Sequence, residues 1–533
     1  MDKKESGGFL CAGFSEIDTE VSMRGKNFYQ LIGDYAAKRP EKPLLTVDNQ
    51  TITYGQFIEQ TSKMAQSLSS FGVKEDTKVG LILSNSIAWY ELFWGAIRIG
   101  AQPVPIDPQS GELELERLLS CADITICFTE KQYRNNHICE VVSKVQKKVP
   151  NVKQVVYLGG EQKKESSFIP YKEFLEAGTG KALSDVYEPD DRHVMSLACT
   201  SGSTGNPKVL SVPYVGFYDA IMDMADYLGF CSDDTMMVGM PLYHQGGFGM
   251  GLQVVIKGGS VIYQPQFEPI RFLETVERYK VTAVQLTSTL AKILISNPKF
   301  YEYDLSNIRI CYFAGEVLPK EIAQIFVEKL GIRVINVIGS SETATMVVWD
   351  SDKDYDVDPS DFSELPFTKV HIWNSEKNET DIGELCIYTT AVIFNYYKNE
   401  QATSQTVVDI DGKRCFRTGD MVERLPDGRF HFLGRCKRII KRGANLVHAE
   451  EVEGYMLTHP LIESVAVIAE AHPVYGEQIV AYIKTVGNKM LTRNDVAKYF
   501  QGKFSAYKIP DKVIVTEELP HDIGKIQFKY IRK

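Results

Sequence analysis

Short apolar runs that alternate with longer helical patterns are the feature that most constrains the fold of this chain. The runs at 78–83, 155–157 and 283–286 have the length and residue types of buried strands, and 89–99 predicts a buried helix. Further strand signals lie at 51–54, 124–127, 195–198, 261–263 and 308–312. Strands that alternate with helices are joined by crossovers, which predicts an α/β fold with parallel sheets.

Length and local composition suggest how the chain is divided. At roughly 150 residues per domain, 533 residues predict about three or four folding units. Residues 1–27 are polar and glycine-rich, which predicts a loose lead-in. The stretch 434–443 carries five cations in ten residues and predicts a connector. We therefore expect a large domain over 28–436 and a small C-terminal domain over 437–533.

Charge and cysteine content argue against several classes of protein. The net charge is −10 and no basic stripe is present, which argues against a nucleic-acid partner. The ten cysteines form no CxxC pair, which predicts free thiols in a reducing compartment. The N-terminus lacks the apolar core of a signal peptide. The sequence also lacks a run of about 18 apolar residues, which a membrane-spanning helix would need. We expect a cytoplasmic protein.

The most informative local motif is Thr200-Ser-Gly-Ser-Thr-Gly-Asn-Pro-Lys208. Its glycine and hydroxyl residues leave backbone N–H groups and hydroxyls available to pyrophosphate oxygens. It is not an ordinary P-loop, because Pro207 lacks an N–H and Val209 stands where a P-loop has Ser or Thr. Taken alone, the stretch could also be a plain glycine turn.

Three charged residues in distant segments, Glu342, Asp420 and Lys525, gain a functional interpretation only together with the other motifs. Each has a structural alternative when taken alone: a helix-terminal acid, a turn residue and a solvated surface lysine.

The motifs together resemble the adenylate-forming superfamily of acyl-CoA synthetases, luciferases and peptide-synthetase adenylation domains. The resemblance runs from about residue 28 to the C-terminus. It rests on five further segments, namely Met240-Pro-Leu-Tyr-His244-Gln-Gly-Gly247, Ala314-Gly-Glu-Val-Leu318, Asn336-Val-Ile-Gly-Ser-Ser-Glu342-Thr343, Thr418-Gly-Asp420 followed by Gly434-Arg435, and Leu519-Pro-His-Asp-Ile-Gly-Lys525.

This resemblance implies a fold and a set of ligands. The expected fold has a large N-terminal domain of doubly wound sheets with a small barrel-like subdomain, and a small mobile α+β C-terminal domain. The expected cofactors are ATP, Mg²⁺ and coenzyme A, or the phosphopantetheine of a carrier protein. The expected substrate is a small-molecule carboxylic acid.

The resemblance also implies roles for single residues. Lys525, Glu342 and His244 are the expected catalytic residues: Lys525 crosses to the α-phosphate, Glu342 helps hold Mg²⁺ and His244 stands at the entrance to the acid pocket. Lys437 is the expected hinge, and Gly443 flanks the thiol channel. The expected nucleotide-binding residues are Thr200, Ser201, Gly202, Ser203, Thr204, Gly205, Lys208, Gly315, Glu316, Val317, Gly339, Ser340, Ser341, Asp420 and Arg435.

Some positions depart from the family pattern. Ile338 replaces a tyrosine that packs on adenine, and Ile523 replaces a Ser or Thr in a segment that is one residue shorter. Ala444 replaces the second glycine of the channel loop, which weakens the case for coenzyme A. No aspartate stands in the segment at 240–247, which disfavours amino-acid substrates.

The expected reaction is ATP-dependent activation of a carboxylic acid as an acyl-adenylate, with release of pyrophosphate, followed by transfer to a thiol. Coenzyme A is the leading acceptor, as in an AMP-forming acyl-CoA synthetase. Three alternatives stay open: an enzyme that loads a carrier protein, a luciferase-type oxidation after adenylation, and a nucleotide-binding protein without catalysis.

Overall fold

The computed structural model describes residues 26–159, 168–183, 185–200, 207–315, 318–374, 376–435, 439–516, 519, 521–522 and 525–526. At Arg435 and Lys525 the backbone is described but the side chain is not, so their roles stay predictions. Eight further predicted site residues lie outside the described residues: Ser201, Gly202, Ser203, Thr204, Gly205, Glu316, Val317 and Lys437.

Polar N-cap residues start the first long helices. Asn27 and Thr53 each close a capping box, at the starts of α2 (Phe28–Lys38) and α3 (Tyr54–Ser70). The side chain of Ser86 accepts a hydrogen bond from a backbone N–H of α4 (Ile87–Arg98). The buried faces of these helices meet in an aromatic core, which anchors the N-terminal part of the large domain.

A parallel sheet forms the first α/β layer. Its order is β4-β3-β5-β6-β7, and every neighbouring pair is parallel. The strands are β3 (Lys78–Ile82), β4 (Gln102–Pro105), β5 (Ile126–Glu130), β6 (Gln154–Leu158) and β7 (Ile169–Pro170). The helices α5 (Glu112–Cys121) and α6 (Ile138–Gln146) lie between them in the chain, and α7 (Tyr171–Ala177) follows β7.

A second, larger sheet also has a parallel centre. Its order across that centre is β1-β11-β10-β12-β13-β14, with antiparallel β2 and β15 at its two sides. The strands are β1 (Pro43–Val47), β2 (Gln50–Thr53), β10 (Thr235–Val238), β11 (Ser260–Tyr263), β12 (Ala283–Leu286), β13 (Ile310–Ala314), β14 (Arg333–Ser340) and β15 (Ala344–Asp350). Its helices are α8 (Tyr214–Tyr227), α9 (Gln245–Val255), α10 (Pro269–Arg278), α11 (Ser288–Ile295), α12 (Lys320–Gln324) and α13 (Ser351–Asp354).

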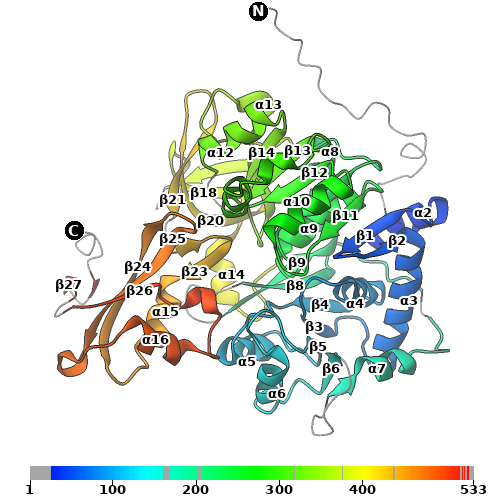
Figure 1. The fold of residues 1–533 in the computed structure, drawn as a ribbon, viewed down its shortest axis with the longest axis horizontal. Helices are drawn as coiled ribbons and strands as arrows, with labels where there is room; N and C mark the ends of the chain where they lie inside the picture. Colours follow the sequence, from blue (N-terminus) through cyan, green and yellow to red (C-terminus); the bar gives the residue numbers. More distant parts are fainter. Residues whose placement is uncertain are drawn as a thin grey trace, which may run out of the picture.

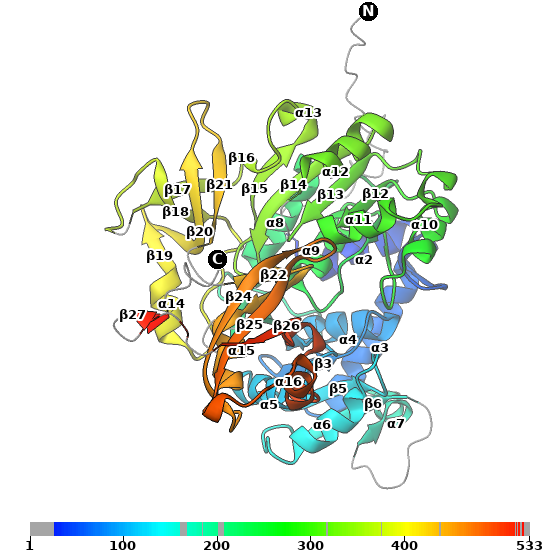
Figure 2. The same cartoon turned by 60° about the vertical axis from the view of Figure 1, so that its left-hand side comes forward.

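Beyond β15 the same sheet continues as antiparallel strands, which lie at the upper left of Figure 2. The helix α14 (Glu400–Thr406) lies beside them in the chain. These strands are β16 (Asp361–Glu364), β17 (Lys369–Trp373), β18 (Ile382–Tyr388), β19 (Val407–Ile410), β20 (Lys413–Arg424) and β21 (Phe430–Arg435).

The strand predicted at 195–198 is present, but it does not enter a parallel sheet. It is part of β8 (Val194–Thr200), which pairs antiparallel with β9 (Lys208–Pro213). The two strands are joined by the predicted phosphate loop, and such a short connection cannot make a parallel crossover. The prediction of parallel pairing was therefore wrong for this strand.

The C-terminal residues form a smaller α+β unit with its own apolar core. In Figure 1 this unit lies at the lower left, against α5 of the large domain. Its elements are β22 (Ile439–Arg442), β23 (Asn445–His448), α15 (Ala449–Met456), β24 (Ile462–His472), β25 (Gly476–Thr485), α16 (Arg493–Phe500), β26 (Lys512–Val515), β27 (His521–Asp522) and β28 (Lys525–Ile526).

The predicted fold class is confirmed: the protein is mixed α/β with a large N-terminal domain and a smaller C-terminal domain. The exact boundary at residues 436 and 437 stays a prediction, because residues 436–438 lie outside the described residues. Within the described residues, no helix has the length and apolarity needed to cross a membrane.

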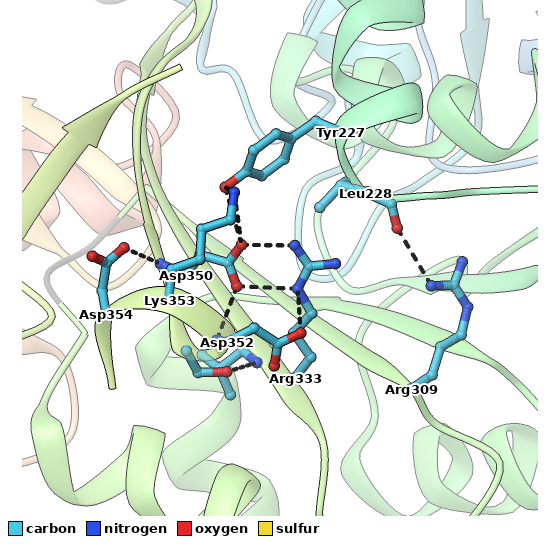
Figure 3. A network of polar contacts seen from close by, with 10 residues as sticks. Tyr227, Leu228, Arg309, Arg333, Asp350, Asp352, Lys353 and Asp354 are labelled. Carbon is cyan, nitrogen blue, oxygen red and sulfur yellow. Dashed lines mark hydrogen bonds and ion pairs between the residues drawn. The ribbon is translucent and has the colours of Figure 1, made fainter. Parts of the chain in front are cut away.

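A buried ion pair fixes the start of β14 against the end of β15 (Figure 3). The guanidinium of Arg333 donates to both carboxylate oxygens of Asp350, at 3.0 and 2.7 Å. The Tyr227 hydroxyl donates to the same carboxylate at 3.0 Å. The β14–β15 hairpin is thus anchored at the end opposite to its turn, and that turn carries the Glu342 motif.

Candidate functional site

A cavity of about 330 Å³ lies where the large and small domains meet. It opens at the C-terminal ends of β13 and β14, where ligands bind in open α/β sheets. The helices α8 and α9 form its apolar part, and the turn between β22 and β23 of the small domain also contributes to its wall. Residues distant in sequence therefore share one enclosed space.

The cavity brings together most of the predicted nucleotide-binding residues that are described. Thr200 and Pro207, which flank the undescribed part of the phosphate loop, both line it. Gly315, Gly339, Ser340, Ser341 and Asp420 line it as well. These separate motifs therefore meet at one cavity, and their binding roles stay predictions.

Local hydrogen bonds shape the turn between β14 and β15. The Ser340 hydroxyl lies 3.0 Å from that of Thr343 and accepts from the backbone N–H of Glu342 at 3.2 Å. A Cβ atom on Gly339 would lie 2.6 Å from the carbonyl oxygen of Ala344. Only glycine fits there without a shift, so the motif glycine is needed for the tight turn itself.

Glu342 and Lys208 do not line the cavity, but one tyrosine connects them. The Tyr396 hydroxyl donates to Oε1 of Glu342 at 2.9 Å. The Nζ atom of Lys208 lies 4.5 Å from the centre of the Tyr396 ring, a cation–π distance. Burial and the nearby Glu342 charge raise the pKa of Tyr396, so its hydroxyl keeps its proton and can donate.

Sequence reasoning missed Tyr396 because it belongs to none of the motifs. It lies in a segment that runs along β9, where its backbone bridges to Leu210. The backbone N–H of Tyr397 donates to the carbonyl oxygen of Val209 at 2.7 Å, which continues this pairing. Only this long-range pairing brings Tyr396 to the phosphate loop and the Glu342 turn.

Asp420 lies in β20, at an irregularity of the strand that is held by another residue outside the motifs. Its side chain is buried and lines the cavity. The preceding Gly419 has φ of 72°, a left-handed conformation that suits glycine. Glu384 accepts from the Gly419 N–H at 3.1 Å and from Arg417 at 3.1 Å, which fastens the irregular stretch to β18.

His244 lies at the N-cap of α9 and lines the cavity, and its place at an acid pocket stays a prediction. Burial lowers the pKa of His244 to about 4. Its imidazole is therefore neutral at pH 7. The neutral ring can accept or donate one hydrogen bond toward the cavity without adding charge.

The small domain presents the β22–β23 turn to the cavity. Gly443 has φ of 60° at the first position of this two-residue turn, where a type II′ turn requires a positive value. Gly443 does not line the cavity, but its neighbours Lys441, Ala444 and Asn445 do. In contrast, the β27–β28 hairpin that contains Lys525 lies at the outer edge of the small domain in Figure 1.

A buried ion cluster joins the two domains beside the cavity. Lys508 lies 2.6 Å from Glu114 of α5 and 3.1 Å from Glu451 of α15. Glu114 also accepts from the N–H and hydroxyl of Ser505, at 2.7 and 2.8 Å. Burial by itself would lower the pKa of Lys508, but the two carboxylates outweigh it and raise the pKa. Lys508 is therefore charged. The sequence motifs did not identify this residue.

Two protein-family models match this chain. Residues 33–397 match the AMP-binding enzyme family, and residues 451–523 match the AMP-binding enzyme C-terminal domain. The chain belongs to the AMP-binding enzyme family. The predicted resemblance to adenylate-forming enzymes is thereby confirmed.

One relative of this AMP-binding enzyme is the mitochondrial medium-chain acyl-CoA ligase ACSF2 of Rattus norvegicus. It is 25% identical over 565 residues, which cover 96% of this chain and 87% of the ligase. The amide bond synthetase McbA from Marinactinospora thermotolerans has a similar structure, with a TM-score of 0.83, 20% identity and coverage of 95% of this chain and 99% of the other.

The o-succinylbenzoate CoA synthetase MenE of Bacillus subtilis provides two structures for comparison. A double mutant bound to a product analogue, OSB-NCoA, has a TM-score of 0.80 at 19% identity. The complex with the acyl-adenylate OSB-AMP has a TM-score of 0.65 at 20% identity. Both alignments cover 94% of this chain and 98% of the other, so the two TM-scores refer to the same extent of the chain.

Magnesium is implied for this AMP-binding enzyme, and the described residues fit a site with few protein ligands. No group of three or more His, Cys, Asp and Glu side chains that could hold a metal occurs in the described part of the chain. Mg²⁺ is commonly held by one or two carboxylates together with substrate phosphates. Glu342, oriented by Tyr396 beside the phosphate loop, suits that arrangement.

Proposed function

We propose that this AMP-binding enzyme activates a carboxylic acid with ATP and transfers the acyl group to the thiol of coenzyme A. The observation that carries the proposal is the single cavity lined by Thr200, Ser341 and Asp420, together with the β22–β23 turn of the small domain. The name of the ACSF2 relative, a medium-chain acyl-CoA ligase, supports this assignment.

The proposed first step joins the acid to the nucleotide. A carboxylate oxygen of the acid attacks the α-phosphorus of ATP, the bond to the β-phosphate oxygen breaks, and pyrophosphate leaves. Little covalent help from the protein is needed, because positioning and charge neutralisation lower the barrier. Bound magnesium would supply part of this charge neutralisation.

Separate residues would position the reactants for this step. Asp420 would accept hydrogen bonds from the ribose hydroxyls, and residues 200–208 would hold the outgoing phosphates. Glu342 would hold the metal, with its carboxylate oriented by Tyr396. Lys525 would meet the developing charge after the small domain has rotated.

The proposed second step transfers the acyl group. The thiol sulfur attacks the acyl carbon of the mixed anhydride, the bond to the phosphate oxygen breaks, and AMP leaves while the thiol proton passes to solvent. The domain arrangement supports this step, since Ala444 rather than the Lys525 hairpin faces the cavity side.

A carrier-protein phosphopantetheine is the second candidate acceptor. Ala444 lines the cavity where the family channel loop has glycine, so the side chain takes up room beside the proposed thiol path. Both acceptors present the same terminal thiol.

Acid-dependent exchange of pyrophosphate into ATP tests the first step. A panel of aliphatic, aryl and amino acids should yield at least one acid that supports exchange. The acids that do so are then incubated with coenzyme A or with a phosphopantetheinyl carrier protein, and thioester is measured. Failure of every acid to support exchange, by protein that binds ATP, would contradict the proposed function.

A further inference from the structure

The deep part of the cavity is apolar except for one amide. Phe217 and Ile221 of α8 and Met250 of α9 form much of its wall. A Cβ atom on Gly249 would lie 3.2 Å from the Phe217 ring and 3.4 Å from Ile221, so this glycine keeps the wall close without closing the space. Gln253, one turn further along α9, lines the same cavity.

Gln253 has a buried side-chain amide, and one atom of this amide makes no hydrogen bond. Its side chain is only 3% exposed and lies beside the hydroxyl of Tyr312. Its Oε1 atom has no hydrogen-bond partner among the described residues. A buried acceptor without a partner is costly, which suggests that a ligand completes it.

A pair of hydroxyls lies on the same cavity wall. The Tyr312 hydroxyl lies 3.1 Å from the hydroxyl of Thr345, and Thr345 lines the cavity. Either hydroxyl of this pair can be the donor. When Tyr312 donates to Thr345, the Thr345 hydrogen can point to the cavity, and the wall then offers one acceptor and one donor.

We infer that the acid substrate carries a hydroxyl or amide group that donates to Gln253 Oε1 and accepts from Thr345. This inference rests on the proposed function and defines the substrate class of that site. An unsubstituted alkyl chain would cover the Gln253 oxygen and give it no hydrogen bond. A hydroxylated or amide-bearing acid satisfies it while its remaining carbon atoms contact Phe217 and Met250.

Pyrophosphate exchange with matched acids tests the inference on the unmodified enzyme. The probes are straight-chain acids of four to eight carbons and benzoic acid, each compared with its isomers that carry one hydroxyl. One hydroxyl position should raise kcat/KM by roughly tenfold or more over the parent acid. A wild-type enzyme that prefers every unsubstituted parent overturns the inference but leaves the proposed function intact.

Gln253→Leu provides the matching variant, because leucine has a similar length and no polar atom. The variant should lose the preference for the hydroxylated acid and gain activity with its parent, while KM for ATP stays unchanged. Met250→Leu changes the same wall without removing a polar group and should keep the preference. If Gln253→Leu keeps the preference for the hydroxylated acid as well, the Gln253 amide does not contact the substrate hydroxyl and the inference is wrong.

Thr345→Val is a second variant, which tests the inference even if Gln253→Leu folds poorly. It removes the donor at the cavity surface and should reduce the same preference by a smaller factor. An unchanged preference in this variant would remove Thr345 from the inferred contact. No exchange with any acid, hydroxylated or not, would count against the proposed function rather than against the choice of acid.

Discussion

At the scale of single residues, the site depends on side chains that orient the motif residues. Tyr396 holds one oxygen of Glu342, and Glu384 holds Gly419 directly before Asp420. A carboxylate that is already oriented loses less conformational freedom when it binds a metal or a hydroxyl. In the proposed function the motif residues carry the chemistry, and these partners fix their geometry.

Tyr396→Phe should weaken the adenylation step. The ring stays next to Lys208, but the hydrogen bond to Glu342 is lost, which corresponds to about 1 kcal/mol or a five- to tenfold effect. We expect a higher Mg²⁺ concentration for half-maximal pyrophosphate exchange. Tyr397→Phe is the matched control, because the Tyr397 hydroxyl donates to Asp123 instead, at 2.8 Å. Equal effects of the two variants would contradict the role of Tyr396.

His244 should make the folded enzyme sensitive to acid. Burial lowers its folded pKa to about 4, below the value of about 6.5 for an unfolded chain. Between those values the unfolded state binds more protons, so stability is lost as pH falls from 6.5 toward 4. Urea unfolding at pH 7 and pH 4.5 measures this loss in the free energy of unfolding. The loss should be smaller in His244→Asn than in the wild-type protein, by on the order of 1–2 kcal/mol. The same loss in both proteins would show that His244 does not contribute.

At the scale of elements, the β14–β15 hairpin positions the Ser340–Glu342 turn. Its far end is held by the Arg333–Asp350 pair, whose carboxylate is fully buried (Figure 3). Burial by itself would raise the pKa of Asp350, but the hydrogen bonds from Arg333 outweigh it and lower the pKa. The ion pair therefore contributes to stability at neutral pH, and this contribution is lost in strong acid.

Asp350→Asn should destabilise the large domain by about 3 kcal/mol, because it leaves the Arg333 charge without its buried partner. Asp352→Asn is the matched control: Asp352 also lies near Arg333, at 3.3 Å, but its side chain is 58% exposed. Its removal should cost less than about 1 kcal/mol. Chemical unfolding at pH 7 measures both, and similar losses would argue against the anchoring role.

At the scale of the whole molecule, the orientation of the small domain depends on contacts with the start of α5. The backbone N–H of Glu112 donates to the carbonyl oxygen of Gly502 at 2.9 Å, and Lys508 lies between Glu114 and Glu451. These contacts place the β22–β23 turn at the cavity. Any rotation that brings Lys525 to the cavity would have to break them.

Gly111→Ala should disfavour this orientation. The added Cβ would lie 2.4 Å from the backbone carbon of Lys503, which cannot move without the small domain. We expect thioester formation from supplied acyl-adenylate to slow by roughly tenfold or more, while pyrophosphate exchange is retained. Gly33→Ala is the control, since its added Cβ would meet nothing within 4 Å. Equal loss of both half-reactions in Gly111→Ala would contradict an effect on domain orientation.

The sequence by itself determined the fold class, the presence of a small C-terminal domain and the motif residues around the cavity. Periodic apolar patterns and glycine-rich turns act over a few neighbouring residues, so they can be read along the chain. Only the tertiary structure decided that Tyr396 meets Glu342, that Glu384 holds Gly419 before Asp420, that Lys508 lies between two carboxylates and that Gln253 faces the cavity. Those contacts join residues tens to hundreds of positions apart, and no local pattern encodes them.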